Sequence, residues 1–439
     1  MAPPAERLPS PRFRHLLEGA YEAAIHAVQP AVVLRGALPD PPCAGRVILL
    51  ALGKAADAMA LEAERHYRNV GVPVQGVVVT PEGNAARHPG AYLPRLTGTH
   101  PTPSEASRTA GEALLKAAGR AEPGDLVLVL VSGGGSALAV APDGVTLDAL
   151  TELHEALLRS GAAIDEMNLV RRQLDRLKGG GLAAAAAPAR VVTLALSDVV
   201  GDDPLAIASG PTVPDPHTPA DALAILDRHG LDLPEIRARL QARAAAPDTA
   251  PPSTSENDVH VIATNRHALE AAQRYFEAAG VEAHLLADDV TGDAREAGRA
   301  AARGVQPWLD ARRDDPQAPS IAFLTGGETT VTVRGSGRGG RNSTYALAFA
   351  LALPGAAPVH ALIADSDGID GSGGHAGAFV EPDLFDRVDR ATALARDADD
   401  DSYAVFEAAG ALYRPGPTGT NVNDLRFVLL PGPSLAGDP

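Results

Sequence analysis

The sequence predicts an α/β protein whose sheets are largely parallel and covered by helices on both faces. Short runs of consecutive apolar residues, such as Leu126–Val131, alternate along the chain with segments of helical spacing. An apolar run of this length between turn residues is typical of a strand buried on both faces, and strand–helix alternation is the pattern of βαβ units. The 439 residues exceed one ordinary core, so two or three domains are expected.

The individual elements follow from apolar periodicity and from Pro, Gly and capping residues at their ends. The predicted strands are 46–52, 76–80, 126–131, 190–196, 260–264, 281–286, 321–325, 359–364 and 424–430. The predicted helices are 13–29, 55–65, 103–118, 146–160, 166–178, 218–229, 265–279, 293–312 and 343–353. For the helix 103–118, Thr102 is the expected N-cap, with Pro103 at the first helical position and Glu105 completing a capping box.

The composition limits the function classes. Hydrophobic residues at 45% and charged residues at 21% are those of a soluble globular protein. A formal net charge of -17 argues against a nucleic-acid partner, which requires a basic face. The single cysteine, Cys43, allows no intrachain disulfide and no cysteine-based zinc site. Because no apolar run approaches the roughly 18 residues of a membrane span and the N-terminus lacks an apolar signal core, a cytoplasmic protein without a membrane partner is expected.

Two stretches have linker-like composition. Residues 245–258 are rich in Ala, Pro, Ser, Thr and Asp and poor in large apolar residues, and 314–320 is a shorter stretch of the same kind. We therefore predict an N-terminal domain over 1–244, with an extension to about 315 as the alternative, and a C-terminal domain over 320–432.

Glycine-rich turns beside basic residues follow several of the predicted strands. The turn Ser132-Gly-Gly-Gly-Ser136 follows 126–131 directly; its glycines let backbone N–H groups approach an anion, so it is a candidate phosphate cradle, with a tight turn that binds nothing as the alternative. Lys54 follows 46–52 and is placed to meet a phosphate or carboxylate, or else is a solvated turn lysine. The run from Lys178 into Gly179 opens a third turn of this kind.

Acidic residues follow other strands. Asp198 comes after 190–196, and Asp367 lies in a glycine-rich turn after 359–364. The carboxyl ends of parallel strands are where α/β enzymes hold metal ligands and bases, so these positions indicate Mg²⁺. The chain has no Walker A motif and no protein-kinase motif set. Glycine turns, cations and carboxylates in recurring combination favour phosphoryl transfer by a kinase of another type.

A second anion-binding composition lies in residues 334–341, with four glycines and three arginines. Gly335, Gly337 and Gly340 match the dinucleotide fingerprint. Their context is wrong, however, because Arg341 stands in the turn and no acidic residue ends a strand about 20 residues later.

Seven motifs spread along the chain form a recognisable set. They are SGGGSA at 132–137, KGGGLA at 178–183, SDVVGDDPLAIASGPT at 197–212, TGGETTVTV at 325–333, GRGGRN at 337–342, DGIDG at 367–371 and GPTGTNVND at 416–424. In this order, and preceded by ALGKA at 51–55, they resemble the glycerate 2-kinase family, whose C-terminal domain is called the MOFRL domain. One detail departs from the family pattern, since Ser343-Thr344 stands where a Gln-Glu-like pair is expected.

The resemblance implies an enzyme of glyoxylate and glycerate metabolism that phosphorylates D-glycerate to 2-phospho-D-glycerate with ATP and Mg²⁺. It also implies a larger, Rossmann-like N-terminal domain, a smaller C-terminal α/β domain, and an active site in the cleft between them. A monomer or a homodimer is expected.

The resemblance also implies site residues. Lys54 and Arg341 resemble the family's paired cleft cations, with catalytic and substrate-binding roles. Beside them we add Glu328, as an acidic partner from the C-terminal domain, and Asn342 as candidate substrate-binding residues. Asp198 is our candidate catalytic base and magnesium ligand, and Asp367 a second magnesium ligand. The predicted nucleotide-binding residues are Ser132, Gly133, Gly134, Gly135, Ser136, Lys178 and Gly179.

Two other functions remain open at this stage. Members of the family have also been labelled hydroxypyruvate reductases, so an NAD(P)H-dependent reductase is the competing enzyme; the poor context of the Gly335–Gly340 fingerprint argues against it. A binding protein that senses a small acid is the third reading, and the acidic residues at strand ends argue against it because they cost stability without a metal or substrate.

Overall fold

The computed structural model describes residues 11–82, 92–245, 257–315, 317–355 and 357–436. The chain forms two compact units: unit 1 combines residues 1–29 with 263–439, and unit 2 is the continuous segment 30–262. The predicted domain ranges, 1–244 and 320–432, remain predictions about domains that fold independently, and most of the linker-like stretch 245–258 lies outside the described residues. In the described part of the chain no helix is long and apolar enough to cross a membrane.

Unit 2 is built on a six-stranded sheet with the order β3-β2-β1-β4-β5-β6, in which the pairs from β3 to β5 are parallel. This is the strand order of doubly wound nucleotide-binding folds, and it confirms the Rossmann-like parallel sheet that the family resemblance implied. The strands are β1 Val47–Leu52, β2 Val74–Pro81, β3 Arg95–Gly98, β4 Leu126–Val131, β5 Arg190–Leu196 and β6 Asn257–Ala263. The helices are α2 Pro30–Val33, α3 Ala56–Asn69, α4 Glu105–Ala118, α5 Gly135–Leu138, α6 Leu147–Ser160, α7 Ile164–Arg172, α8 Gly181–Ala186, the 3₁₀ turn η1 Ile207–Ser209, α9 Pro219–Arg228 and α10 Pro234–Ala245.

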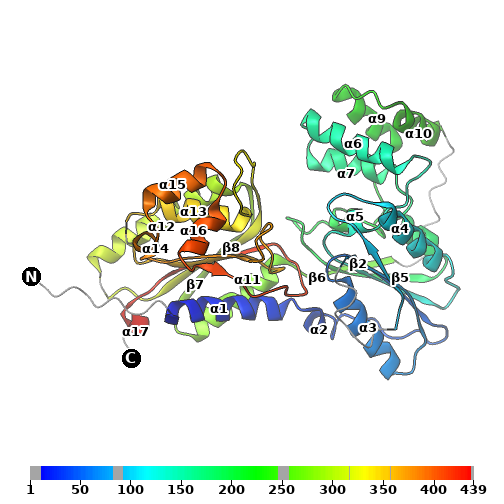
Figure 1. Ribbon diagram of the computed structural model, residues 1–439. Helices are drawn as coiled ribbons and strands as arrows, with labels where there is room; N and C mark the ends of the chain where they lie inside the picture. Colours follow the sequence, from blue (N-terminus) through cyan, green and yellow to red (C-terminus); the bar gives the residue numbers. More distant parts are fainter. Residues whose placement is uncertain (1–10, 83–91, 246–256, 316, 356, 437–439) are drawn as a thin grey trace, which may run out of the picture. The chain divides into compact units, whose positions relative to one another are not determined.

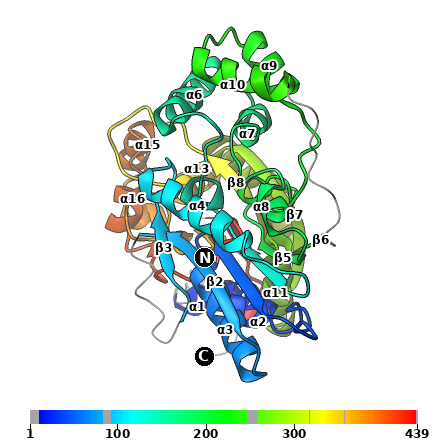
Figure 2. The ribbon, with the colours of Figure 1, turned by 90° about the vertical axis from the view of Figure 1, so that its right-hand side faces the viewer.

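Helices cover both faces of this sheet because its central strands are apolar on both sides. Every residue of β1 and β4 is buried. Alternate residues, such as Leu50 and Val129, pack with Leu114 of α4 and Leu182 of α8 in one core, while α3 contacts the sheet at β1, β2 and β4. Figure 2 shows α6, α7, α9 and α10 gathered into a separate helical layer, which has its own core around Leu153.

Two predicted helices of unit 2 have different ends. Helix α4 begins at Glu105 with Ser104 as N-cap, two residues after the predicted Thr102, and the Ser104 amide donates to Ser107 Oγ at 3.2 Å. The helix predicted over 166–178 ends at Arg172. Beyond that point the chain turns to place Asp175, whose Oδ1 accepts from the amides of Ala141 and Leu177, so side-chain hydrogen bonding overrides helical spacing there.

Unit 1 is built on a mixed six-stranded sheet with the order β11-β10-β9-β12-β8-β7. Only β7 and β8 pair in parallel; the other pairs are antiparallel. The strands are β7 Glu282–Asp293, β8 Ile321–Thr330, β9 His360–Asp365, β10 Gly377–Val380, β11 Leu412–Tyr413 and β12 Asp424–Leu430. The helices are α1 Pro11–Ala27, α11 Asn265–Ala278, α12 Ala294–Asp314, α13 Arg341–Ala352, α14 Leu384–Arg387, α15 Arg390–Ala398, α16 Ser402–Ala408 and α17 Pro433–Ala436.

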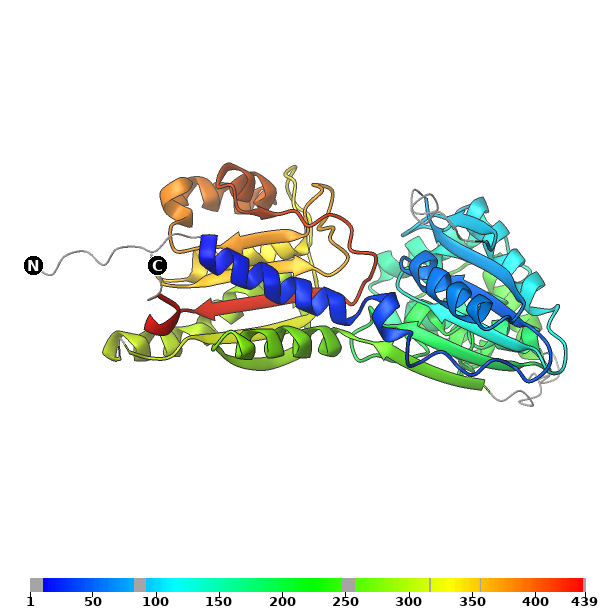
Figure 3. The same ribbon diagram turned by 90° about the horizontal axis from the view of Figure 1, so that it is seen from below.

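The first helix of the chain is part of unit 1. Helices α1 and α11 lie side by side on one face of the mixed sheet, and α12 and α13 lie on the other (Figure 1); Figure 3 shows α1 running along the sheet. The Tyr21 hydroxyl donates to the Asp365 carbonyl at 2.7 Å, and Arg14 forms an ion pair with Glu381. Helix α1 is therefore held by residues more than 340 positions later in the chain.

Candidate functional site

The strand order of unit 2 places one predicted cluster at a topological switch point. From β1 the sheet extends to β2 on one side and to β4 on the other, and Leu52 of β1 pairs with Val131 of β4 in parallel. The turns after these two strands contain Lys54 and Ser132–Ser136. In doubly wound sheets ligands bind outside the carboxyl ends of the strands, at the place where the chain reverses its direction of winding.

The two turns contact each other directly. The Lys54 amide donates to the Gly133 carbonyl at 2.9 Å. Gly134 has φ of 80°, and a Cβ added there would lie 3.5 Å from Lys54 Cγ and 3.3 Å from His100 Cδ2. The Lys54 and His100 side chains therefore pass close to the glycine turn. Burial lowers the pKa of His100, and the Lys54 charge lowers it further, so the imidazole is neutral at pH 7.

The serines of the glycine turn have structural partners. Ser132 is fully buried, and its Oγ accepts from the Ala55 amide at 3.0 Å, which ties the turn after β4 to the one after β1. Ser136 Oγ lies 2.8 Å from Ser209 Oγ. The amides of Gly135 and Ser136 open α5, at a helix end where amides have no partner within the helix. The backbone of the turn, rather than its hydroxyl groups, is the part suited to an anion.

Asp198 belongs to the same edge of the sheet. Strand β5 pairs with β4 in parallel through Val131 and Ala195, and Asp198 lies two residues beyond the end of β5. Neighbouring strands are about 4.8 Å apart, so the turn that carries Asp198 adjoins the glycine turn. The sequence prediction thus groups Lys54, the glycine turn and Asp198 on adjacent strands.

Lys178 and Gly179 have other roles in the structure. Lys178 is buried, with Nζ 3.0 Å from Asp175 Oδ2. The Gly179 amide donates to the Ser209 carbonyl at 3.1 Å. Since Ser209 also contacts Ser136, η1 connects this turn to the glycine turn, but the Gly179 amide is used within the protein. Nucleotide binding by these two residues stays a prediction.

The second predicted cluster lies within unit 1, around Arg341. The guanidinium of Arg341 forms three ion pairs: with Asp424 and Asp365, each at 2.8 Å, and with Glu328 at 2.9 Å. Asn342 is fully buried, and its Nδ2 donates to Asp424 Oδ1 at 2.7 Å. The structure therefore brings Arg341, Glu328 and Asn342 together, as predicted, through a carboxylate that the sequence reasoning did not identify.

Two members of this cluster, Asp365 and Arg341, have shifted pKa values. Burial raises the pKa of Asp365 well above its usual value, and the Asp367 charge adds to this, while Arg341 opposes it. Burial alone would lower the pKa of Arg341, but Asp424, Asp365 and Glu328 raise it. Arg341 is therefore always charged, and the carboxylates hold it in a fixed position.

Asp365 and Asp424 were missed because the sequence analysis assumed parallel strands. Asp365 ends β9 and Asp424 begins β12, and the two are paired neighbours in an antiparallel ladder. Asp424 also pairs with Gly327, next to Glu328 on β8. Antiparallel pairing brings the end of one strand beside the start of the next. Asp424 is the last residue of the motif GPTGTNVND, so this motif contained the signal that could have identified it as a site residue.

The predicted magnesium ligands lie in different units, so magnesium binding by this pair stays a prediction. In the residues that the structure describes, no three His, Cys, Asp or Glu side chains are arranged to hold a metal ion. Asp198 belongs to unit 2 and Asp367 to unit 1. Asp367 Oδ1 accepts from the Ile369 amide at 2.9 Å, and the Asp367 amide donates to Asp365 Oδ1 at 3.0 Å.

The dinucleotide fingerprint has a structural explanation. The amides of Gly335 and Gly337 donate to Asp400 Oδ2 at 2.6 Å and to the Asp399 carbonyl at 2.9 Å. A Cβ on Gly340 would lie 2.1 Å from Asp370 Oδ1. The glycines thus allow close approach of the protein's own carboxylates. The Asp400 carboxylate and the Asp399 carbonyl therefore occupy amides that would bind a pyrophosphate, and the charge of the nearby carboxylates would repel it.

Comparison with known proteins identifies the family. Residues 16–241 match the family model "Domain of unknown function (DUF4147)", and residues 321–424 match the MOFRL family. A putative hydroxypyruvate reductase of Agrobacterium vitis is 42% identical over 427 residues, covering 95% of this chain and 94% of the relative. The D-glycerate 2-kinase of Thermotoga maritima is 37% identical over 414 residues, covering 93% and 96%.

The fold agrees with these matches. A crystal structure of glycerate kinase from Thermotoga maritima aligns with a TM-score of 0.84 at 35% identity, covering 95% of this chain and 99% of that one. The chain therefore belongs to the glycerate kinase family, in which a DUF4147 region is followed by a MOFRL region.

Proposed function

We propose that the protein is a glycerate 2-kinase, which transfers the γ-phosphoryl group of ATP to the C2 hydroxyl of D-glycerate. The observation that carries the proposal is the glycine turn beside Lys54 at the switch point of a nucleotide-binding sheet. Backbone amides at a helix start and a cation are the groups that phosphoryl transfer requires. The names of the relatives from Thermotoga maritima and Pyrococcus horikoshii support the same activity.

The roles follow from the positions. Amides of the glycine turn hold phosphate oxygens of ATP, and Lys54 offsets the charge that develops on the transferring group. The hydroxyl oxygen of glycerate attacks the γ-phosphorus, and ADP leaves. Asp198 accepts the proton that this hydroxyl group loses. Magnesium commonly takes one or two protein carboxylates and completes its shell with phosphate oxygens and water, so Asp198 suffices as its protein ligand.

Hydroxypyruvate reduction is the second candidate, because two relatives from Agrobacterium vitis carry that name. A reductase needs a site for a nicotinamide dinucleotide. The amides of Gly335 and Gly337 already donate to Asp400 and Asp399. They are therefore not available to bind the pyrophosphate of such a cofactor. We therefore favour the kinase.

The test combines two assays on the same preparation. The first measures ADP release with D-glycerate, ATP and Mg²⁺, and the second measures NADH and NADPH oxidation with hydroxypyruvate. Enolase added without a mutase then converts 2-phosphoglycerate, but not 3-phosphoglycerate, to phosphoenolpyruvate. We expect glycerate-dependent ADP release and direct conversion by enolase. Nicotinamide oxidation without ADP release would refute the kinase and support the reductase.

A further inference from the structure

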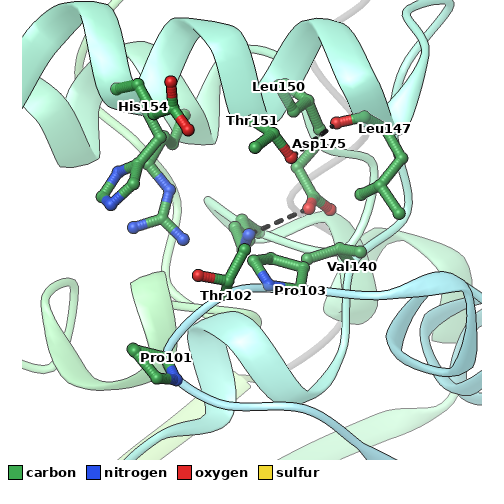
Figure 4. Close-up of a pocket in the computed structure, with 12 residues that line it drawn as sticks. Pro101, Thr102, Pro103, Val140, Leu147, Leu150, Thr151, His154 and Asp175 are labelled. Atoms are coloured by element: carbon green, nitrogen blue, oxygen red, sulfur yellow. Dashed lines mark hydrogen bonds and ion pairs between the residues drawn. The ribbon is translucent and has the colours of Figure 1, made fainter.

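A pocket in unit 2 lies beneath the helical layer, and its lining includes no residue of the turn Ser132–Ser136. It is bounded by α6, by the segment after α7, and by the loop that precedes α4 (Figure 4). One wall is apolar and consists of Pro101, Pro103, Val140, Leu147 and Leu150. The remaining lining includes several ionisable side chains, whose charges determine what the pocket can bind.

Two of these charges neutralise each other. Asp175 and Lys178 are both buried, and Lys178 Nζ lies 3.0 Å from Asp175 Oδ2. Asp175 Oδ1 accepts from the amides of Ala141, at 3.2 Å, and Leu177, at 2.8 Å. Asp175 is thereby fixed in the floor of the pocket, and its charge is matched by Lys178.

Arg171 is the cation that remains. Within the described residues its guanidinium has no hydrogen bond and no carboxylate within 4.0 Å. Glu155, which also lines the pocket, pairs instead with Arg159 at 3.3 Å on the surface of α6. Burial lowers the pKa of Arg171, although Asp175 opposes this. A partly buried guanidinium without a carboxylate partner favours the binding of an anion.

His154 supplies a neutral polar group beside this cation. Its Nδ1 is buried and has no hydrogen-bond partner within the described chain, and Figure 4 shows its ring beside the pocket. Burial lowers the pKa of His154, and the Arg171 charge adds to this. A neutral imidazole nitrogen either donates to a carboxylate or accepts from a hydroxyl group.

We propose that this pocket binds one small organic carboxylate, with the carboxylate on Arg171, a polar substituent on His154, and the short carbon chain against the apolar wall. The enclosed volume is about 90 Å³, whereas a cavity of about 150 Å³ holds benzene. The pocket therefore suits a ligand of a few heavy atoms, not a nucleotide. The observations behind the proposal are confined to the lining of this pocket, so the proposal stands whether or not the protein is a kinase.

Calorimetric titration of the full-length protein tests the proposal, with D-glycerate, L-lactate and pyruvate as probes and inorganic phosphate as the comparison anion. Titrations are done in a Lys54→Ala background, so that binding does not depend on the predicted catalytic lysine. Arg171→Gln should weaken carboxylate binding at least about tenfold. Arg228→Gln, which removes an exposed arginine of α9 whose partner Glu166 does not line the pocket, should leave it unchanged. Leu150→Phe, which fills the pocket without changing its charge, should also abolish binding.

The proposal is refuted if no probe binds, if Arg171→Gln binds as the Lys54→Ala parent does, or if phosphate competes better than every carboxylate. Melting temperatures of the variants identify any that fail to fold; if Arg171→Gln does, Arg171→Met, which also removes the charge and keeps an unbranched side chain, provides the same comparison. Steady-state kinetics of Arg171→Gln in the protein that keeps Lys54 then show whether the bound carboxylate is the substrate or an effector. If it is the substrate, Arg171→Gln raises the KM for D-glycerate; if it is an effector, that KM is unchanged.

Discussion

The two glycine-rich turns of this protein, at 132–136 and 334–341, have opposite surroundings. In unit 2, the turn Ser132–Ser136 follows a parallel strand, opens α5 and adjoins Lys54. In unit 1, the amides of the 334–341 turn donate to the side chains and backbone of Asp399, Asp400 and Asp401. A glycine-rich turn therefore indicates that backbone amides meet an anion or another acceptor, but not whether the acceptor is a ligand or part of the protein itself.

The largest effect should come from Lys54 in the unit 2 turn. Lys54→Ala is expected to lower kcat about 100-fold or more, as loss of one preorganised charged group at a reacting centre commonly does, with a small change in melting temperature. The assay is ADP release with D-glycerate. Lys116→Ala, on the exposed end of α4, is the matched control and should retain full activity. A loss of activity that merely follows a loss of folded protein would contradict the catalytic role.

Matched glycine substitutions compare the two turns directly. Gly134→Ala places a Cβ at φ of 80° beside Lys54 and His100, which costs about 1 kcal/mol of strain and should raise the KM for ATP roughly tenfold as the cradle shifts. Gly337→Ala places a Cβ 2.4 Å from Asp401 Cβ and should lower the free energy of unfolding by about 1–3 kcal/mol without a specific change in that KM.

Fluorescence of the single tryptophan reports on the second variant, because Trp308 lies on α12 in unit 1. Denaturant titration followed at Trp308 measures the stability of that unit, and steady-state kinetics measure the KM. If Gly337→Ala were as stable as the parent protein and weak in ATP binding, the assignment of the two turns would be reversed.

Asp400 should stabilise unit 1 in a pH-dependent manner. Burial alone would raise its pKa, but hydrogen bonds from the Gly335 and Arg334 amides and the ion pair with Arg295 lower it. Its folded pKa thus lies below the unfolded value of about 3.9. The stabilisation is complete above that value and is lost as pH falls through the folded pKa.

Asp400→Asn is therefore expected to cost about 1–3 kcal/mol at pH 7, and the difference from the parent should shrink below about pH 4. Urea titrations followed at Trp308 over a pH series provide the measurement. Asp289→Asn, at an exposed position of β7 in the same unit, is the comparison variant. A difference that stays constant down to the lowest pH would contradict the pKa assignment.

The smallest effect concerns His100, beside the unit 2 turn. Its pKa is lowered by burial and then by Lys54. Removing the lysine charge should raise the His100 pKa towards its usual value without restoring it fully, because the burial remains. Titration of the imidazole by NMR in Lys54→Ala and Lys116→Ala distinguishes the two causes. An unchanged pKa in Lys54→Ala would mean that the two side chains do not interact.

Sequence reasoning found the elements whose signal is local. Strands β1, β4 and β5 are uninterrupted apolar runs, and the residues just beyond them, including Lys54 and Asp198, were placed correctly on the carboxyl edge of the sheet. Strand β3 was missed because its four residues, Arg95–Gly98, have no apolar pattern. Helices α14 to α16 were missed because each is short, and short helices give little periodic signal.

The site residues also divide into those with a local sequence signal and those that depend on contacts between distant segments. Arg341, Glu328 and Asn342 were identified from motifs, but their shared partner Asp424 depends on antiparallel pairing that the local sequence does not reveal. Arg171 was not among the predicted site residues, because its position beside His154 results from the packing of α7 against its neighbours. Contacts between distant segments are therefore what the sequence alone did not supply.

The position of α1 has a consequence for synthesis on the ribosome. Unit 2 is one continuous segment and has all its residues once Ile262 has been made. Unit 1 has its first helix at the start of the chain, while β12, which lies inside its sheet between β9 and β8, is nearly the last element translated. At about 5–20 residues per second, the apolar face of α1, with Leu17 and Tyr21, waits roughly 20–80 s for its binding surface to be completed. A chaperone that shields this helix during elongation would increase the yield of native protein more than one that acts on the finished chain.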